Sequence, residues 1–171
     1  MSSKYPWYEV ADDDKIMQGD FIPECPIIIP PSEISGEDEF DVTIKNYDVI
    51  IMSQSCDIEY NKIDLVLLCP VWPLEEMEKN DFMKSSKGKE ELRRGNVTGY
   101  HLLNNCELED FITGYRVVDF RNVYSVPLDF IKEFNKSKRL RLLPPYREHL
   151  SQAFARFFMR VGLPVDIPPF K

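Results

Sequence analysis

An apolar helical face near the C-terminus constrains the fold of this chain more than any other feature. In the stretch PPYREHLSQAFARFFMRVG, apolar side chains recur at steps of four, three and one, along one side of an α-helix: Tyr146, Leu150, Ala153, Phe154, Phe157, Phe158 and Val161. Pro145 suits the start of this helix and Gly162 its end. A face lined by phenylalanine needs an apolar cover, so we expect it to pack on the core, with a dimer interface as the alternative.

Short β-branched blocks indicate the surface on which this helix packs. Residues 47–54 (YDVIIMSQ) and 62–71 (KIDLVLLCPV) are expected to form two buried strands joined by a turn. Further strands are expected in IMQGDFI (16–22), NVTGYHLL (96–103), ITGYRVVDF (112–120) and NVYSV (122–126). The proline-rich, acidic stretch 23–41 is expected to be a surface loop, because proline lacks the N–H that a central strand donates.

These elements predict a single α+β domain over residues 1–171. Its expected parts are an N-terminal arm (1–15), a β-rich barrel (16–126) with a helical insertion (74–94), and a C-terminal helical segment (127–171). The strand-rich part favours a small, twisted, SH3-like barrel, because closure removes unpaired strand edges. The helices are expected to be segregated from the strands, with the C-terminal amphipathic helix packed on the sheet.

The charge of the chain is divided unevenly. The net charge is −8, but residues 136–171 carry eight basic and two acidic side chains, a net of +6, which leaves −14 for residues 1–135. The overall negative charge disfavours a general nucleic-acid binder, because binding to a phosphate backbone depends on lysine and arginine. The basic end is expected to contact the acidic part of the same chain, an acidic partner, or RNA.

Several functional classes lack their sequence signatures. The start, MSSKYPWYEVADDDK, has no basic region followed by an apolar one, and no run of about 18 apolar residues occurs, so we expect a cytoplasmic protein without membrane contact. The four cysteines include no CxxC pair, so neither disulfides nor a zinc site are expected. Phosphate-binding glycine loops, HExxH and GxSxG are also missing, and we expect no cofactor.

Two resemblances bear on ancestry. The motifs SQSCDIE, VLLCPVWPL and PPYREHLSQAFARFFMRVGLP resemble those of a group of uncharacterised bacterial proteins, for which an antiphage-defence setting is expected. The order QGDFI, proline-rich loop, DVIIMS over residues 16–54 resembles the opening of the PemK/MazF family of toxin endoribonucleases. That second resemblance implies a PemK/MazF-like barrel and, as an alternative function, RNA cleavage.

The match to the toxin motif is incomplete. Gly19 and Asp20 agree with it, and Ser53 stands where the second strand ends, but Gln18 occupies the place of a basic residue. Cleavage by a 2′-hydroxyl needs a proton acceptor and a cation that stabilises the charged phosphorus centre, and glutamine provides neither. If the activity is retained, Arg116, Arg121 or the basic C-terminal segment has to supply the cation.

The candidate functional turn between the two buried strands comprises Ser53, Gln54, Ser55, Cys56 and Asp57. Cys56 would need a histidine nearby to act as a nucleophile, and the two histidines are His101 and His149. A thiol enzyme or metal protein centred on Cys56 is therefore the second alternative, whereas a structural turn with no catalytic residue is the expectation. Arg147, Arg156 and Arg160 are the expected partner contacts.

The hypothesis that follows is a non-enzymatic intracellular binding or regulatory protein that acts through its charged surfaces. The expected partner is another protein or a second copy, and RNA is disfavoured by the net charge.

Overall fold

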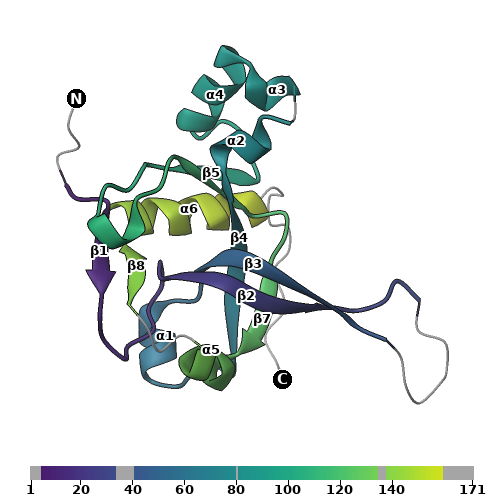
Figure 1. Ribbon diagram of the computed structural model, residues 1–171, viewed down its shortest axis with the longest axis vertical. Helices are drawn as coiled ribbons and strands as arrows, with labels where there is room; N and C mark the ends of the chain where they lie inside the picture. Colours follow the sequence, from purple (N-terminus) through teal and green to yellow (C-terminus); the bar gives the residue numbers. More distant parts are fainter. Residues whose placement is uncertain (1–4, 34–40, 80, 135–137, 160–171) are drawn as a thin grey trace, which may run out of the picture.

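The protein combines a central antiparallel sheet with flanking helices (Figure 1). The structure, a computed structural model, describes residues 5–33, 41–79, 81–134 and 138–159. The main sheet has six strands: β2 (Phe21–Ile29), β3 (Thr43–Ile51), β4 (Leu65–Pro73), β5 (Tyr100–Leu103), β6 (Arg116–Asp119) and β7 (Tyr124–Pro127). A separate two-stranded sheet joins β1 (Tyr8–Ala11) to β8 (Arg139–Leu142).

Strand β4 organises the main sheet. The strand order is β2-β3-β4-β6-β5, and β7 also pairs with β4. Residues 65–68 of β4 pair with β7, and residues 71–73 pair with β6. On β3, Val49 and Ile51 face one core while Ile50 faces the other, because neighbouring strand side chains point to opposite faces. On β4, likewise, Val66 and Leu68 lie in one core and Cys69 and Val71 in the other, so the middle of β4 is covered on both sides, whereas Leu65 and Leu67 are exposed.

The sheet is not a closed barrel, so that part of the predicted fold is wrong. Within the described residues, β2 pairs along its length only with β3, and β2 is an edge strand. Pro23 and Pro26 remove N–H groups from this strand, and the register shifts between Ile22 and Cys25 around Glu24, whose φ is 50°. These features keep a further strand from pairing with β2.

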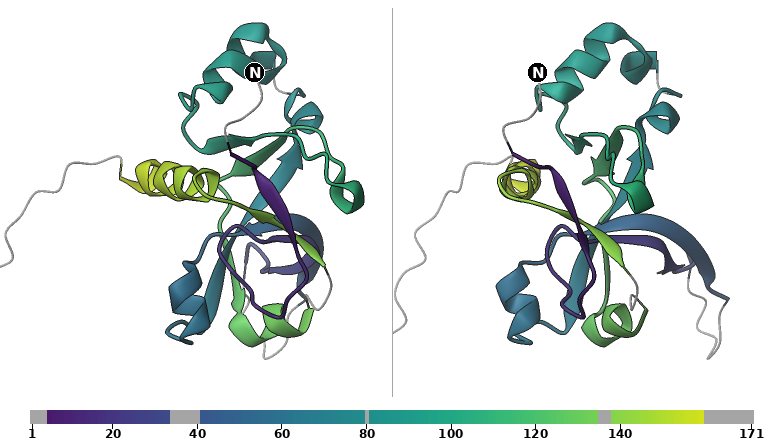
Figure 2. Two further views of the ribbon diagram at one scale, coloured as in Figure 1. Left: turned by 90° about the vertical axis from the view of Figure 1, so that its left-hand side faces the viewer. Right: turned by 60° about the vertical axis from the view of Figure 1, so that its left-hand side comes forward.

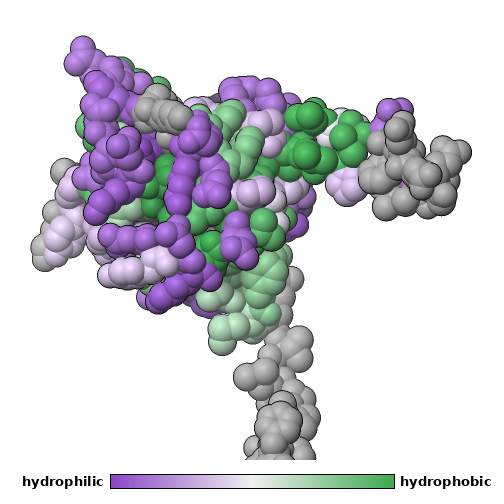
Figure 3. All heavy atoms as spheres, turned by 90° about the horizontal axis from the view of Figure 1, so that it is seen from below, coloured by the Kyte–Doolittle hydropathy of each residue, from purple (hydrophilic) through white to green (hydrophobic). Residues whose placement is uncertain are grey.

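The predicted loop 23–41 is also partly wrong. β2 continues to Ile29 and β3 begins at Thr43, so both strands extend into an arm that projects from the body (Figures 1 and 2). Proline is tolerated here because β2 lies at an edge of the sheet. Apolar side chains gather on the arm, at the right of Figure 3, with Ile28 and Ile44 both more than half exposed.

Five of the described helices lie toward the two ends of the sheet, and α6 (Tyr146–Phe158) lies across it (Figure 1). The five are α1 (Ser55–Glu59), α2 (Leu74–Met77), α3 (Asp81–Lys84), α4 (Ser86–Arg93) and α5 (Leu128–Phe134), with a 3₁₀ turn at Glu109–Phe111. The predicted insertion 74–94 contains three short helices, which project at the top of Figure 1. None of the helices described has the length and apolar character needed to span a membrane.

Helix α6 packs on the sheet through the apolar face seen in its sequence. Leu150 is fully buried, and Phe154 and Phe157 pack against the core cluster that contains Val118 and Phe120. Phe154 and Phe120 meet edge to face, with ring centroids 5.4 Å apart. The buried part of this apolar face thus belongs to the core. At the end of the helix, Phe158 is 60% exposed, and Val161 lies outside the described residues.

The predicted N-terminal arm contributes a strand, which the sequence pattern did not indicate. β1 pairs with β8, and neither strand was predicted. β8 has the sequence RLRL, and all four of its residues are buried, including Arg139 and Arg141. Buried arginine is rare without a paired acid, which is why the pattern was not recognised as a strand.

Asp20 is the acid that pairs with both arginines. It is fully buried, with Arg139 Nε 2.6 Å from its Oδ2 and Arg141 Nε 2.5 Å from its Oδ1. Asp13 adds a second carboxylate, 2.6 Å from Arg139, and both arginines also donate to the carbonyl of Lys15. These contacts hold the segment between β1 and β2 against β8. The basic segment therefore contacts an acidic part of its own chain.

Replacement of Asp20 by asparagine should destabilise the fold strongly. The variant keeps the shape of the side chain but leaves two buried guanidinium groups with only the half-exposed carboxylates of Asp13 and Glu9, so we expect a loss of about 3–5 kcal/mol in the free energy of unfolding. Urea denaturation measures this loss. Asp129→Asn, at a carboxylate that is 96% exposed, is the matched control and should change stability by less than about 0.5 kcal/mol. Equal stability of the two variants would contradict the role given to Asp20.

Candidate functional site

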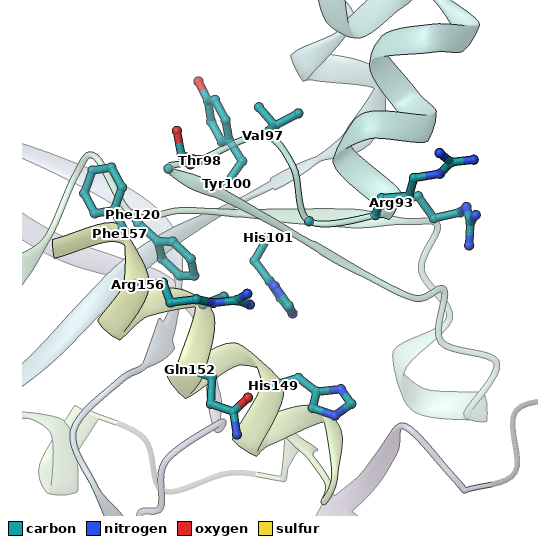
Figure 4. A pocket seen from close by; sticks show the side chains of 14 residues that line it. Arg93, Val97, Thr98, Tyr100, His101, Phe120, His149, Gln152, Arg156 and Phe157 are labelled. Carbon is teal, nitrogen blue, oxygen red and sulfur yellow. The ribbon is translucent and has the colours of Figure 1, made fainter. Parts of the chain in front are cut away.

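A pocket of about 310 Å³ lies between α6 and the segment that leads from α4 into β5 (Figure 4). The residues that give it chemical character are Arg93, Arg94, His101, His149, Gln152 and Arg156. Its walls come from parts of the chain about 50 residues apart, and the packing of α6 on the sheet brings them together. The position of this pocket is therefore a consequence of tertiary structure.

Both histidines of the sequence line this pocket. His101 comes from β5 and is partly buried, with its ring 6.3 Å from that of Phe120, whereas His149 comes from α6 and is exposed. Burial, together with the smaller effects of the neighbouring His149 and Arg156, lowers the pKa of His101 to about 4. His101 is thus neutral at neutral pH, and its imidazole offers one donor and one acceptor to a ligand.

Three arginines surround the pocket, and they are not equally neutralised. Glu90 accepts bonds of 2.7 Å from Arg93 and from Arg94, and these bonds lower its pKa to about 2. Within the part of the chain that the structure describes, Arg156 forms no salt bridge. In Figure 4 its guanidinium extends from α6 toward His101, in agreement with their electrostatic coupling. The pocket therefore has an excess of positive charge.

Two glycines shape the segment that leads from α4 into β5 along the pocket. Gly95 follows α4 with φ of +73°, so the chain turns after Arg93 and Arg94. Gly99 has φ of +93°, and a Cβ there would lie 3.1 Å from Arg121 and 3.3 Å from Phe157. The close approach of β5 to α6 thus depends on glycine at this position.

The predicted turn 53–57 leads into helix α1, which begins at Ser55, and its polar groups serve local structure. Ser53 Oγ accepts a bond of 2.8 Å from Leu67 N, and Ser55 Oγ accepts one of 3.1 Å from Gln18 N. Cys56 is exposed, with its sulfur 3.7 Å from Asp57 Oδ1 and 3.8 Å from Gln54 Oε1. Helix α1 and strand β5 lie at opposite ends of the sheet in Figure 1, so the structure does not bring Cys56 and His101 together.

The positions shared with the toxin motif also have structural partners. Gln18 Nε2 donates a bond of 2.8 Å to the carbonyl of Met52, and Asp20 binds the two buried arginines. Arg116 lies over the ring of Phe21, at 5.7 Å from its centroid, and Arg121 pairs with Asp119 at 2.9 Å. RNA cleavage would need a cation from Arg116, Arg121 or the basic C-terminal segment. Of these three, only the C-terminal segment contributes a side chain to the lining of the histidine pocket, that of Arg156.

Two of the three arginines predicted as partner contacts, Arg147 and Arg156, do not lie on the same side of α6. Arg147 and Arg156 are nine residues apart on α6, about two and a half turns, which places them on opposite sides of the helix. Arg147 pairs with Glu148 at 2.8 Å, and Arg160 lies outside the described residues. Sequence reasoning missed Arg93, Arg94 and the pairing of the two histidines, because nothing local connects them to α6.

The four cysteine side chains do not form a metal centre among the described residues. All four cysteines are free, and burial raises the pKa of Cys25 to about 11 and that of Cys69 to about 12, so both are protonated thiols. In the described ranges, no group of three or more histidine, cysteine, aspartate or glutamate side chains is placed to hold a metal ion.

Comparisons with known proteins find no match for this chain, either among protein-family models or among curated proteins.

Burial of His101 should make stability fall in mild acid. Its pKa is about 4 in the folded state and about 6.5 when unfolded. Between these values the unfolded chain binds a proton that the folded chain does not, so stability declines from pH 6.5 toward pH 4, by about 2–3 kcal/mol. Urea denaturation across this range should show a smaller decline in His101→Gln, while His149→Gln, at an exposed position, keeps most of it. Parallel curves for wild type and His101→Gln would contradict this assignment.

Proposed function

We propose that this protein is an intracellular binding module whose working site is the pocket between α6 and β5, and that the site takes an anionic ligand. The observation that carries the proposal is the placement of Arg156, which extends over the pocket without a salt-bridge partner in the described residues. Arginines gathered around one cavity with a single carboxylate among them favour the binding of a negatively charged ligand.

The charge balance supports the same conclusion. The pocket carries three arginines, and Glu90 compensates for only one positive charge. The neighbouring Asp119 and Arg121 neutralise each other and leave this balance unchanged. By contrast, Arg139 and Arg141 are fully used inside the protein. Of the basic side chains in the C-terminal part that the structure describes, Arg156 is therefore the one best suited to an external partner.

A distant relation to the PemK/MazF toxins, with an SH3-like sheet and a regulatory role in bacterial defence, remains part of this proposal. It is supported by the short Gly19-Asp20 match and by the order of the first strands. The structural use of Gln18 and Asp20 favours a protein that binds at another site and does not cleave RNA in the toxin manner.

RNA cleavage at the histidine pocket is the second candidate function, because the two histidines and Arg156 line one cavity. Such a group could in principle accept a proton, donate a proton and stabilise a charged phosphorus centre. The purified protein incubated with RNA of mixed sequence should leave it intact if the site only binds. Cleavage of this RNA by the wild type, lost in His101→Gln, would favour RNA cleavage over anion binding as the function.

The binding proposal is tested with matched substitutions on α6. Arg156→Gln should weaken binding of inorganic pyrophosphate about tenfold or more, because it removes a charge-assisted hydrogen bond from a partly enclosed site. Arg147→Gln makes the same change on the opposite side of the helix and should leave the affinity within about twofold. Isothermal titration calorimetry at low and moderate salt measures both.

The salt series provides a second readout. Affinity of the wild type should fall as salt rises, and Arg156→Gln should show a shallower dependence. Similar effects of the two substitutions, or no binding of pyrophosphate by the wild type, would contradict the proposal.

A further inference from the structure

The pocket between α6 and β5 has two chemically different ends. Arg93 lies at one end in Figure 4, and Phe120 and Phe157 lie at the other, with His101 and the guanidinium of Arg156 between them. Arg94, the residue after Arg93, also lines the pocket. A small inorganic anion would contact only the charged part and leave the aromatic part exposed to water. A ligand that fills the cavity must therefore combine an anionic group with an apolar, flat body.

The charge of the site indicates a phosphate group with two negative charges. The three arginines exceed Glu90 by two positive charges. A terminal phosphate ester carries about −1.5 to −2 at neutral pH, whereas a carboxylate or an internal phosphodiester carries one. Arginine also presents a planar fork of donors that fits phosphate oxygens. A terminal phosphate ester thus matches the excess charge, and the other two groups leave part of it uncompensated.

The size of the cavity limits the rest of the ligand. About 310 Å³ lies at the lower end of the range for small-molecule sites, which is enough for one nucleotide but not for a chain of several. The half-buried ring of His101, backed by Phe120, and the ring of Phe157 give a flat base aromatic contact. Gln152 adds an amide that can both donate and accept a hydrogen bond at a base edge.

We infer that the pocket binds a single nucleotide with a terminal phosphate, which contacts Arg93, Arg94 and Arg156 while the base lies toward Phe157. This inference rests on the proposed function, since it names the class of anion that the site takes. The same chemistry occurs in a free nucleoside monophosphate and in the phosphorylated end of a single strand, so the source is decided by experiment.

Calorimetric titration of the full chain with matched ligands tests the inference. The probes are inorganic phosphate, the four nucleosides and the four nucleoside 5′-monophosphates. At least one monophosphate should bind about tenfold or more tightly than inorganic phosphate, and its nucleoside should bind at least about tenfold more weakly than the monophosphate. Equal affinities for phosphate and all monophosphates would overturn the inference but leave the anion-binding function intact. Failure of phosphate, pyrophosphate and every monophosphate to bind would overturn both.

Two substitutions locate the two parts of the ligand. Arg156→Gln should weaken the binding of phosphate and of the preferred monophosphate alike, by about tenfold or more. Phe157→Leu keeps an apolar side chain on α6 and should weaken only the monophosphate, by about threefold to tenfold. Thermal unfolding of Phe157→Leu verifies that this variant folds. If it does not fold, Ala153→Val, which narrows the same wall of the pocket from α6, takes its place in the titration. If the substitution at Phe157 or Ala153 weakens the binding of phosphate and of the nucleotide to the same extent, the inference is overturned.

The source of the nucleotide is decided with short single strands. A 5′-phosphorylated trinucleotide and its 5′-hydroxyl counterpart are compared with the free monophosphate. Tighter binding of the phosphorylated strand indicates that the protein recognises a strand end, and tighter binding of the free monophosphate indicates a small-molecule ligand. Both results support a terminal phosphate. Equal, strong binding of both strands would overturn the inference, because internal phosphodiesters would then be the recognised group.

Discussion

The buried pairing of Asp20 with Arg139 and Arg141 is the contact on which the rest of this structure depends. One fully buried carboxylate binds two buried guanidinium groups that are 119 and 121 residues away in the sequence. Burial of any of these charges without its partner would cost several kcal/mol. The segment before β2 and strand β8 are therefore joined wherever the chain folds correctly, and the β1–β8 sheet forms beside them.

The same contact determines where the candidate site lies. β8 leads within four residues into α6, whose Tyr146 stacks on Trp7 with ring centroids 3.6 Å apart. Leu143 N donates to the carbonyl of Trp7 at 2.8 Å, so the start of α6 is held by the N-terminal strand. With Leu150 buried in the core, α6 is positioned so that Arg156 and His149 face β5. A structural ion cluster at one end of α6 thus supports an electropositive pocket along it.

The basic C-terminal segment serves two separate purposes. Arg139 and Arg141 are neutralised by acids of the N-terminal part and contribute to the fold. Arg156 has a place where a ligand can reach it. This division follows from position, because a strand between the N-terminal acids and the core is desolvated, whereas the pocket between α6 and β5 is open to water. A count of charges along the sequence cannot separate the two roles.

Some of the architecture was predictable from the residues alone, because local pattern determines it. The steps of Leu150, Ala153 and Phe157 predicted α6 and its buried face, and the β-branched runs predicted β3 and β4. Only the tertiary structure decided that the sheet stays open, that the arginines of β8 are buried, and that His101 meets His149 and Arg156. Those outcomes depend on contacts between residues far apart in the chain, whose charges and shapes become complementary only after folding.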